Sequence, residues 1–262
     1  MESLLIFLAT GAVAGLMAGL FGVGGGMIMV PALALLLPKS GIEPAVVMQV
    51  AVATSLAVIA ATSVSSAWSH HRRGGVLWPA LRALVPGLMT GSVLGAFVAD
   101  RLPSRTLAVM VGVGALVTAA QMFANRKPRA ARELPGPAGL ATVGGVIGLL
   151  SSLIGIGGGS LTVPFLSACN VGIRQAVGTA AAAGVPIAWA GALGFIFAGR
   201  NLALPGPHLG YVSLSGFAGL AAASILTAPL GARLAHGLPP LVLKRAFALL
   251  LTGIGVHMLL PG

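Results

Sequence analysis

The chain reads Gly22-Val-Gly24-Gly25-Gly26-Met-Ile-Met-Val30-Pro31 and repeats this pattern as Gly155-Ile-Gly157-Gly158-Gly159-Ser-Leu-Thr-Val163-Pro164. The matching residues keep one constant spacing, and both copies lie inside long apolar segments. Glycine disfavours a helix by about 1 kcal/mol per residue and adopts backbone angles that other residues avoid. Consecutive glycines therefore predict a helix break, which a membrane tolerates only where the freed backbone faces protein or a water-filled cavity. We interpret both copies as walls of a substrate site.

The composition is that of a membrane protein. Of the 262 residues, 57% are hydrophobic and only 7% are charged, whereas about a quarter of the residues in a soluble domain are charged. Apolar runs longer than about 18 residues recur along the chain, so we expect an all-α polytopic membrane protein. The first apolar segment lacks a basic start and a cleavage pattern, so we expect a membrane segment rather than a cleaved signal.

The charged residues indicate membrane topology. The net charge of +11 would suit nucleic acid, but the Lys and Arg residues cluster in short loops between apolar spans, so we expect no nucleic-acid partner. No carboxylate lies inside a span, so a proton relay is not indicated. The single cysteine, Cys169, excludes an intrachain disulfide. Because no catalytic or metal-binding constellation is present, we expect neither an enzyme nor a cofactor.

Two halves of the chain follow the same plan, which indicates an internal duplication. We predict a first transmembrane repeat over 1–124, a basic cytoplasmic linker over 125–137 and a second repeat over 138–262. Outside the glycine motifs, Val52-Ala-Thr54 resembles Val177-Gly-Thr179. Residues 70–75 are expected to form a basic loop. The predicted apolar segments are 4–37, 45–69, 76–99, 106–124, 138–169, 175–198, 208–234 and 241–260.

Segments 4–37 and 138–169 are too long for one simple span. As a continuous helix, the first would reach about 50 Å against a hydrocarbon core of about 30 Å. Each segment is either one broken span or a hairpin that turns at its glycines. Single spans would divide the basic residues evenly between the two sides. Hairpins would leave only four basic residues on one side, Lys39, Arg101, Arg105 and Arg200.

The distribution of basic residues favours the hairpins, because basic residues concentrate on the cytoplasmic side of a membrane. The cytoplasmic set would then be Arg72, Arg73, Arg82, Arg126, Lys127, Arg129, Arg132, Arg174, Arg233, Lys244 and Arg245. Each half would cross the membrane an odd number of times. The two repeats would therefore be inverted, each a glycine-broken helical hairpin followed by three transmembrane helices, as in many secondary transporters.

The glycine breaks are candidate anion sites. A helix that restarts after such a break has free N–H groups and a partial positive charge at its N-terminus, which bind anions without a basic side chain. Pro31 and Pro164 either lie inside these helices or begin them, and the sequence leaves both readings open. Scattered glycines such as Gly87, Gly91 and Gly95 are expected to allow close helix packing instead.

Hydroxyl groups inside the spans are further candidates. They can donate to an oxyanion, although Ser and Thr in membrane helices more often bond their own backbone. The set of predicted substrate-binding residues is Gly24, Gly25, Gly26, Gly157, Gly158, Gly159, Ser160, Thr54, Ser55 and Thr179.

The duplicated Gly-Gly-Gly-x-x-x-Val-Pro pattern resembles the TauE/SafE sulfite exporter family, also called the 4-toluene sulfonate uptake permease family. The segment His71-Arg-Arg-Gly-Gly-Val-Leu-Trp78 and the turns at Gly95–Pro103 and Gly231–Pro239 also look like family motifs. In one departure, Ala180 stands where serine is usual, which weakens that position as a donor. The resemblance covers nearly the whole chain and implies transport of small sulfur-containing anions such as sulfite or organosulfonates.

We therefore expect a multi-pass transporter of the bacterial inner membrane that works by alternating access and holds a small anion at the glycine breaks. An anion channel, or a transporter of other small carboxylates, remains an alternative. The sequence leaves open whether the protein is a homo-oligomer.

Overall fold

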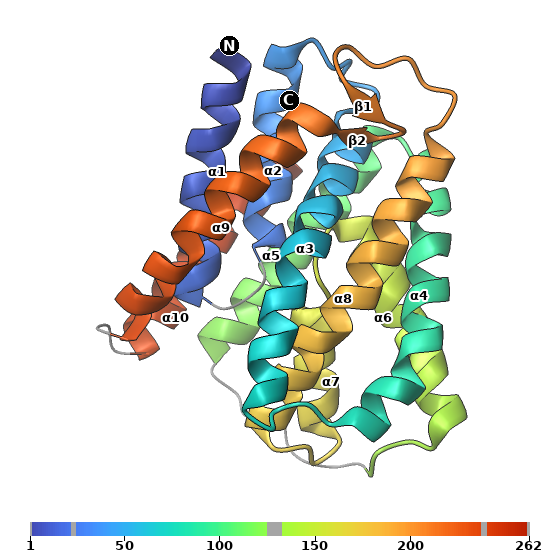
Figure 1. Ribbon diagram of the computed structural model, residues 1–262, viewed down its shortest axis with the longest axis vertical. Coiled ribbons are helices and arrows are strands. Elements are labelled where there is room, and N and C mark those ends of the chain that lie inside the picture. Colours follow the sequence, from blue (N-terminus) through green and yellow to red (C-terminus); the bar gives the residue numbers. More distant parts are fainter. Residues whose placement is uncertain (1, 22–24, 125–132, 237–239, 261–262) are drawn as a thin grey trace.

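A computed structural model describes residues 2–21, 25–124, 133–236 and 240–260 (Figure 1). The expected all-α membrane fold is confirmed. The described helices and strands are α1 (Glu2–Phe21), α2 (Gly26–Leu36), the 3-10 helix η1 (Leu37–Ser40), α3 (Val47–Arg72), α4 (Trp78–Arg101), α5 (Ser104–Ala124), α6 (Pro137–Ile154), α7 (Gly159–Ala168), α8 (Ile173–Ala198), β1 (His208–Leu209), β2 (Val212–Ser213), α9 (Leu214–His236) and α10 (Pro240–Leu259).

Five of the described helices are long and apolar enough to cross a membrane, namely α3, α4, α5, α6 and α8. Of these, α3 and α8 form the centre of the bundle. In their most apolar stretches of 18 residues, 78% and 61% of the residues are buried, against 44% or less in the other three helices. By contrast, α2 and α7 have 11 and 10 residues. At 1.5 Å per residue each reaches only about half of a 30 Å hydrocarbon core. Both short helices begin at the glycine motifs.

The two halves of the chain are interleaved. In Figure 1, α1 runs down from the N-terminus and α2 runs back up, whereas α6 runs up and α7 runs back down. The most extensive packing joins helices from different halves: α1 lies on α9, α4 on α6, α3 on α8, and α5 on α10. By their order in the two halves, α1 corresponds to α6 and α4 corresponds to α9. The α1–α9 pair and the α6–α4 pair are therefore equivalent contacts.

Small residues allow α4 and α6 to approach closely. A Cβ added to Gly95 would lie 2.7 Å from the carbonyl oxygen of Leu149, and one added to Gly144 would lie 2.5 Å from that of Leu84. Gly87 and Gly91 face the backbone of α6 in the same way. The packing interpretation of the scattered glycines on α4 is therefore confirmed.

Two sequence predictions about element ends are wrong. Residues 208–213 form a small antiparallel hairpin, β1–β2, instead of the start of a helix. Gly206 and Gly210 have φ angles of 80° and 54°, which a helix does not accommodate, so α9 begins only at Leu214. In addition, α3 extends through His70, His71 and Arg72, which were expected to lie in a loop, and the chain turns at Gly74 with φ 65°.

The β1–β2 hairpin is fixed to the end of α4. The phenol of Tyr211 donates a 2.7 Å hydrogen bond to Asp100, and its ring lies edge-on to Phe195 of α8. Burial raises the pKa of the Tyr211 phenol, and the bond to Asp100 raises it further. The phenol therefore keeps its proton and acts as the donor.

Candidate functional site

The two glycine motifs meet inside the bundle. A Cβ added to Gly26 would lie 2.5 Å from the carbonyl oxygen of Gly155 and 3.1 Å from the Cα of Ile156. The side chain of Ile59 in α3 is close to the same added Cβ on Gly26, and it would lie 3.1 Å from a Cβ added to Gly157. Ile59 therefore lies against both motifs. The start of α2 and the turn between α6 and α7 are thus in van der Waals contact beside α3.

Left-handed glycines shape both turns. Gly25 (φ 70°) precedes α2 and Gly158 (φ 75°) precedes α7, and neither helix start has a side-chain cap. The carbonyl of Gly25 accepts the N–H groups of Ile28 and Met29, and that of Gly158 accepts those of Leu161 and Thr162. The N–H groups before these first bonds have no carbonyl within their own helix. Only glycine adopts this conformation readily, which is why the motif needs it.

Both prolines of the motif lie inside their helices, so the structure decides between the two readings of the sequence. Pro31 and Pro164 have no N–H, and each withholds a helical hydrogen bond from the carbonyl four residues before it. These are the carbonyls of Met27 and Ser160, in the first turns of α2 and α7. Each of these carbonyls therefore lacks the donor that a helix normally provides four residues later.

Most of the predicted site residues gather at these turns, namely Gly25, Gly26, Gly157, Gly158, Gly159 and Ser160. Ser55 joins them from α3, because its hydroxyl donates a 3.1 Å hydrogen bond to the carbonyl of Gly155. Its counterpart in the second half is Ala180, which cannot form the equivalent bond. Gly24 lies outside the described residues.

Thr54 and Thr179 occupy a different place. The hydroxyl of Thr54 accepts the backbone N–H of Ser213 at 3.1 Å, just before α9, and that of Thr179 accepts the N–H of Leu77 at 2.8 Å, just before α4. Both side chains are fully buried. These two bonds occupy equivalent places in the two halves: one attaches the start of α9 to α3, and the other attaches the start of α4 to α8. In this structure, the two threonines that recur in the sequence therefore have a packing role.

Several hydroxyls near the second turn were not singled out from the sequence. Ser151, Ser152 and Thr162 have an exposed fraction of 0% and no hydrogen-bond partner among the residues that the structure describes. Ser63 of α3 is in the same state, with 8% exposed. A buried hydroxyl without a partner costs about 1–3 kcal/mol. In the sequence, the two adjacent serines Ser151 and Ser152 beside the glycines were the signal that could have indicated these hydroxyls. Whether a hydroxyl has a hydrogen-bond partner, however, depends on tertiary contacts.

The surroundings of the turns carry no charge. The segments 44–69, 137–172 and 175–198, which contain the membrane-embedded parts of α3, α6, α7 and α8, have no Asp, Glu, Lys, Arg or His. Groups of three or more His, Cys, Asp or Glu suited to a metal ion are likewise absent from the described part of the chain. Any anion at the turns would be held by backbone N–H groups, hydroxyls and the helix dipole.

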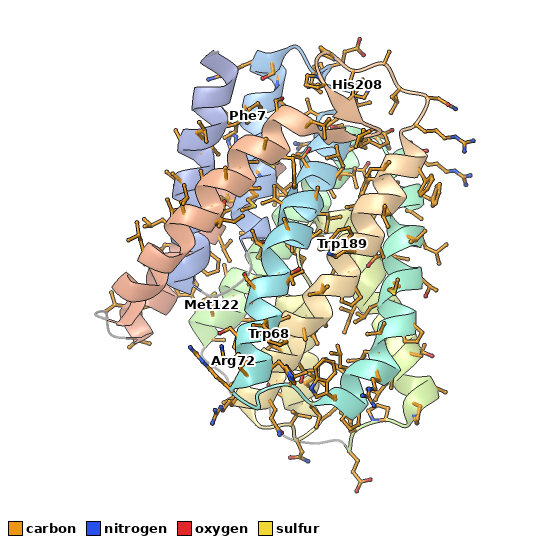
Figure 2. The ribbon with its side chains drawn as sticks, in the orientation of Figure 1. Phe7, Trp68, Arg72, Met122, Trp189 and His208 are labelled. Carbon is orange, nitrogen blue, oxygen red and sulfur yellow. The ribbon has the colours of Figure 1, made fainter. Side chains whose placement is uncertain are left out.

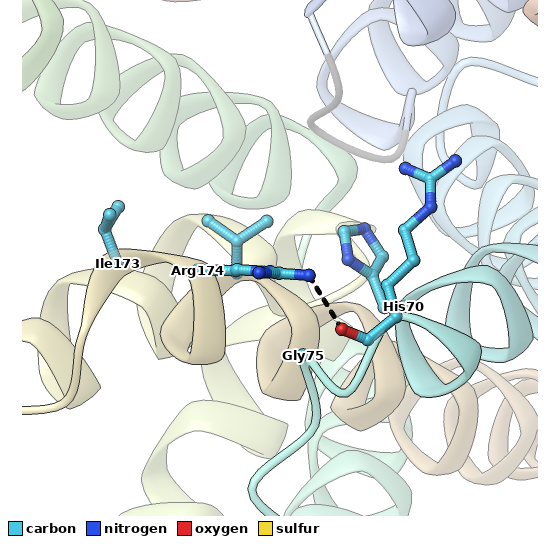
Figure 3. Close-up of a pocket in the computed structure, with 6 residues that line it drawn as sticks. His70, Gly75, Ile173 and Arg174 are labelled. Atoms are coloured by element: carbon cyan, nitrogen blue, oxygen red, sulfur yellow. Dashed lines mark hydrogen bonds between the residues drawn. The ribbon is translucent and has the colours of Figure 1, made fainter.

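A basic hollow lies on the surface where α3 ends and α8 begins. It has a volume of about 270 Å³ and is lined by His70, Arg73, Gly75, Ile173, Arg174 and Val177 (Figure 3). The guanidinium of Arg174 donates a 2.8 Å hydrogen bond to the carbonyl of Arg73, which joins the two halves. Figure 2 shows Arg72 at this end and His208 at the opposite end.

Comparison with known proteins places the chain among membrane transporters. The sequence profile described as Sulfite exporter TauE/SafE matches residues 7–258. A probable membrane transporter protein of Haemophilus influenzae is 36% identical over 259 residues, which cover 98% of each chain. One from Methanocaldococcus jannaschii is 26% identical over 97% of this chain and 95% of its own. One from Bacillus subtilis is 32% identical over 62% of this chain and 66% of its own. No solved structure shows significant similarity to the chain.

Proposed function

Because the chain belongs to the TauE/SafE sulfite exporter family, we propose that this membrane transporter moves small sulfur-containing anions such as sulfite or organosulfonates. The anion binds at the glycine turns through backbone N–H groups and nearby hydroxyls. The observation that carries the proposal is that α2 and α7 both begin inside the bundle at uncapped left-handed glycines, and that the two glycine motifs meet where Gly26 lies against Gly155. Such helix ends bind anions through their N–H groups and dipoles.

The proposed mechanism is alternating access of two inverted repeats, 1–124 and 138–262, joined by the linker 125–137. Opposite directions of α1 and α6 support the inversion (Figure 1), as does the exchange symmetry of the helix pairs. The equivalent bonds of Thr54 and Thr179 support it further. Most residues of α2 are buried, whereas α7 buries only Thr162 and Leu166. In the alternate state the two short helices would exchange these environments.

The basic end of the bundle is proposed to face the cytoplasm of a bacterium, with the protein in the inner membrane. Arg72, Arg73 and Arg174 lie at this end, whereas Arg101 and Arg105 lie at the opposite one. This distribution follows the tendency of basic residues to stay on the cytoplasmic side. The basic hollow would raise the local concentration of anions near the inner opening of the transporter.

Uptake into proteoliposomes tests the proposal. The purified protein is expected to take up sulfite or methanesulfonate with saturation, well above empty vesicles and above acetate. Flux that does not saturate would indicate a channel, preferential uptake of acetate would indicate a carboxylate transporter, and no flux above empty vesicles would refute the proposal.

A matched pair of variants locates the site. Gly159→Leu and Gly253→Leu both introduce a bulky side chain where no atom lies within 4 Å of the added Cβ. We expect Gly159→Leu, at the start of α7, to abolish uptake. We expect Gly253→Leu, on the exposed face of α10, to retain it. Equal activity of the two variants would contradict the location of the site.

A further inference from the structure

The two glycine turns differ in chemistry. Resting on the proposed function, we infer that the second turn, at Ser151, Gly158, Gly159 and Thr162, is the binding site in this conformation, and that it takes singly charged oxyanions in preference to doubly charged ones.

Accessibility separates the two turns. Gly25 and Gly26 are buried, and Gly26 abuts the carbonyl of Gly155 with no room for a methyl group. Gly159 and Ser160 are only half-buried, and a Cβ added to Gly159 would find no atom within 4 Å. Both positions begin a short helix and provide N–H groups ahead of the first helical bond. Among the residues that the structure describes, the space for a ligand therefore lies beside the second helix start, at Gly159.

Unpaired hydroxyls also mark the second turn. A Cβ at Gly158 would lie 3.7 Å from the Oγ of Ser151 and 3.6 Å from the Oγ1 of Thr162, so both hydroxyls face the same small volume, which the end of the Ile187 side chain fills in this conformation. Both side chains are fully buried and have no hydrogen-bond partner among the described residues. A ligand that enters beside Gly159 and displaces the end of the flexible Ile187 side chain would satisfy them with its oxygens. At the same spacing in the first motif the sequence has Ala18 and Met29, which have no hydroxyl.

The charge of the ligand follows from the surroundings of this turn. Along α3 and α8 the first ionisable residues are His70 and Arg174, at the basic end of the bundle. Along α4, whose Gly95 lies against Ser152, they are Asp100 and Arg101 at the opposite end. Moving an ion from water into a medium of low dielectric constant costs free energy that rises with the square of its charge. A dianion therefore incurs about four times the penalty of a monoanion of the same size.

The available attraction suits a monoanion. A helix N-terminus carries about half of a positive charge, and two hydroxyl donors add to it without adding net charge. The segments 44–69, 137–172 and 175–198, which surround the turn, contain no cationic side chain to compensate a second negative charge. For sulfite, which exists as a monoanion and a dianion near neutral pH, the form bound would be hydrogen sulfite. Organosulfonates with one sulfonate group and no amine, such as methanesulfonate, carry the same single charge.

Ligand-induced thermal stabilisation of the purified protein tests the charge preference. Methanesulfonate and sulfate are compared at equal anion concentration and equal ionic strength. We expect methanesulfonate to raise the unfolding temperature and sulfate to have at least about tenfold weaker apparent affinity. Equal or stronger stabilisation by sulfate would overturn the preference for monoanions.

Two variants test the location. In Ser151→Ala and Thr162→Val, the affinity for methanesulfonate should fall at least about tenfold, because a hydrogen bond to a charged ligand is lost. Without ligand, neither variant should be less stable than the wild type, because the lost hydroxyl had no partner. Ser65→Ala and Thr142→Val serve as controls, since these exposed hydroxyls bond their own helices. Unchanged affinity in both site variants would overturn the location.

A pH series gives a second readout. We expect uptake of sulfite to fall as the pH rises and hydrogen sulfite loses its proton, whereas uptake of methanesulfonate stays level over the same range. Parallel profiles for the two anions would overturn the inference. This failure is distinct from that of the proposed function, because absence of all anion transport in the wild type would refute the function itself.

Discussion

Gly26→Ala and Gly159→Ala are the same substitution at equivalent positions of the two halves, yet the structure predicts opposite effects on stability. A methyl group on Gly26 would lie 2.5 Å from the Gly155 carbonyl oxygen and 2.9 Å from the side chain of Ile59. Backbone cannot move aside as a flexible side chain can, so we expect overpacking to cost about 1–3 kcal/mol. For a chain of this size, each kcal/mol lowers the unfolding temperature by about 2–4 °C.

Gly159→Ala should not destabilise the protein, because its methyl group would meet no atom within 4 Å. Gly159 does not have a positive φ angle, so alanine fits its backbone. The smaller conformational freedom of the unfolded chain should add about 0.4–1 kcal/mol of stability. The same methyl group would occupy the space in which the anion is proposed to bind, so affinity for methanesulfonate should fall.

Thermal unfolding in detergent, followed by tryptophan fluorescence, measures both variants beside the wild type. The reasoning predicts a lower unfolding temperature for Gly26→Ala and an unchanged or higher one for Gly159→Ala. Equal destabilisation of the two variants would refute the packing difference between the turns. A stable Gly26→Ala would show that the two motifs are not in contact as described.

Other regions of the structure give three further predictions. Thr54→Val and Thr179→Val should each lower the free energy of unfolding by about 1–3 kcal/mol in chemical or thermal unfolding, because each leaves a backbone N–H without its acceptor. Serine at either position should restore most of this loss. No loss of stability in either valine variant would contradict the packing role. Arg174→Ala should slow anion uptake several-fold at low ionic strength and only slightly at high salt, where the attraction between charges is screened. A slowing that does not depend on salt would show that Arg174 does not act by attracting anions. Tyr211→Phe should cost about 1–3 kcal/mol, because Asp100 loses its hydrogen-bond donor, and wild-type stability would show that this bond does not hold the hairpin.

Local signals in the sequence predicted much of the fold. Long apolar runs predicted the helical spans, because each residue in lipid must satisfy its backbone bonds within its own segment. The triplets of glycine predicted where α2 and α7 begin, because glycine adopts the left-handed angles seen at Gly25 and Gly158 without the steric penalty of a Cβ. The hairpin β1–β2 was missed, since a short strand pair near an apolar segment has no periodic pattern of its own.

The candidate site was less predictable, because its chemistry depends on contacts between distant segments. Recurrence drew attention to Thr54 and Thr179 as substrate-binding candidates, but their hydrogen-bond partners in the structure, Ser213 and Leu77, are more than a hundred residues away in the sequence. The unpaired state of Ser151 is likewise a property of the folded bundle. The basic hollow arises only when Arg174 meets the end of α3.

Countertransport of methanesulfonate tests the central claim most directly. Proteoliposomes are loaded with unlabelled methanesulfonate and diluted into a trace of labelled methanesulfonate, and internal label is followed over time. An alternating-access transporter with a site at the glycine turns should accumulate label transiently above its equilibrium level, and Gly159→Leu should abolish the overshoot while Gly253→Leu retains it. A monotonic rise to equilibrium in the wild type, or an overshoot that survives in Gly159→Leu, would contradict the account.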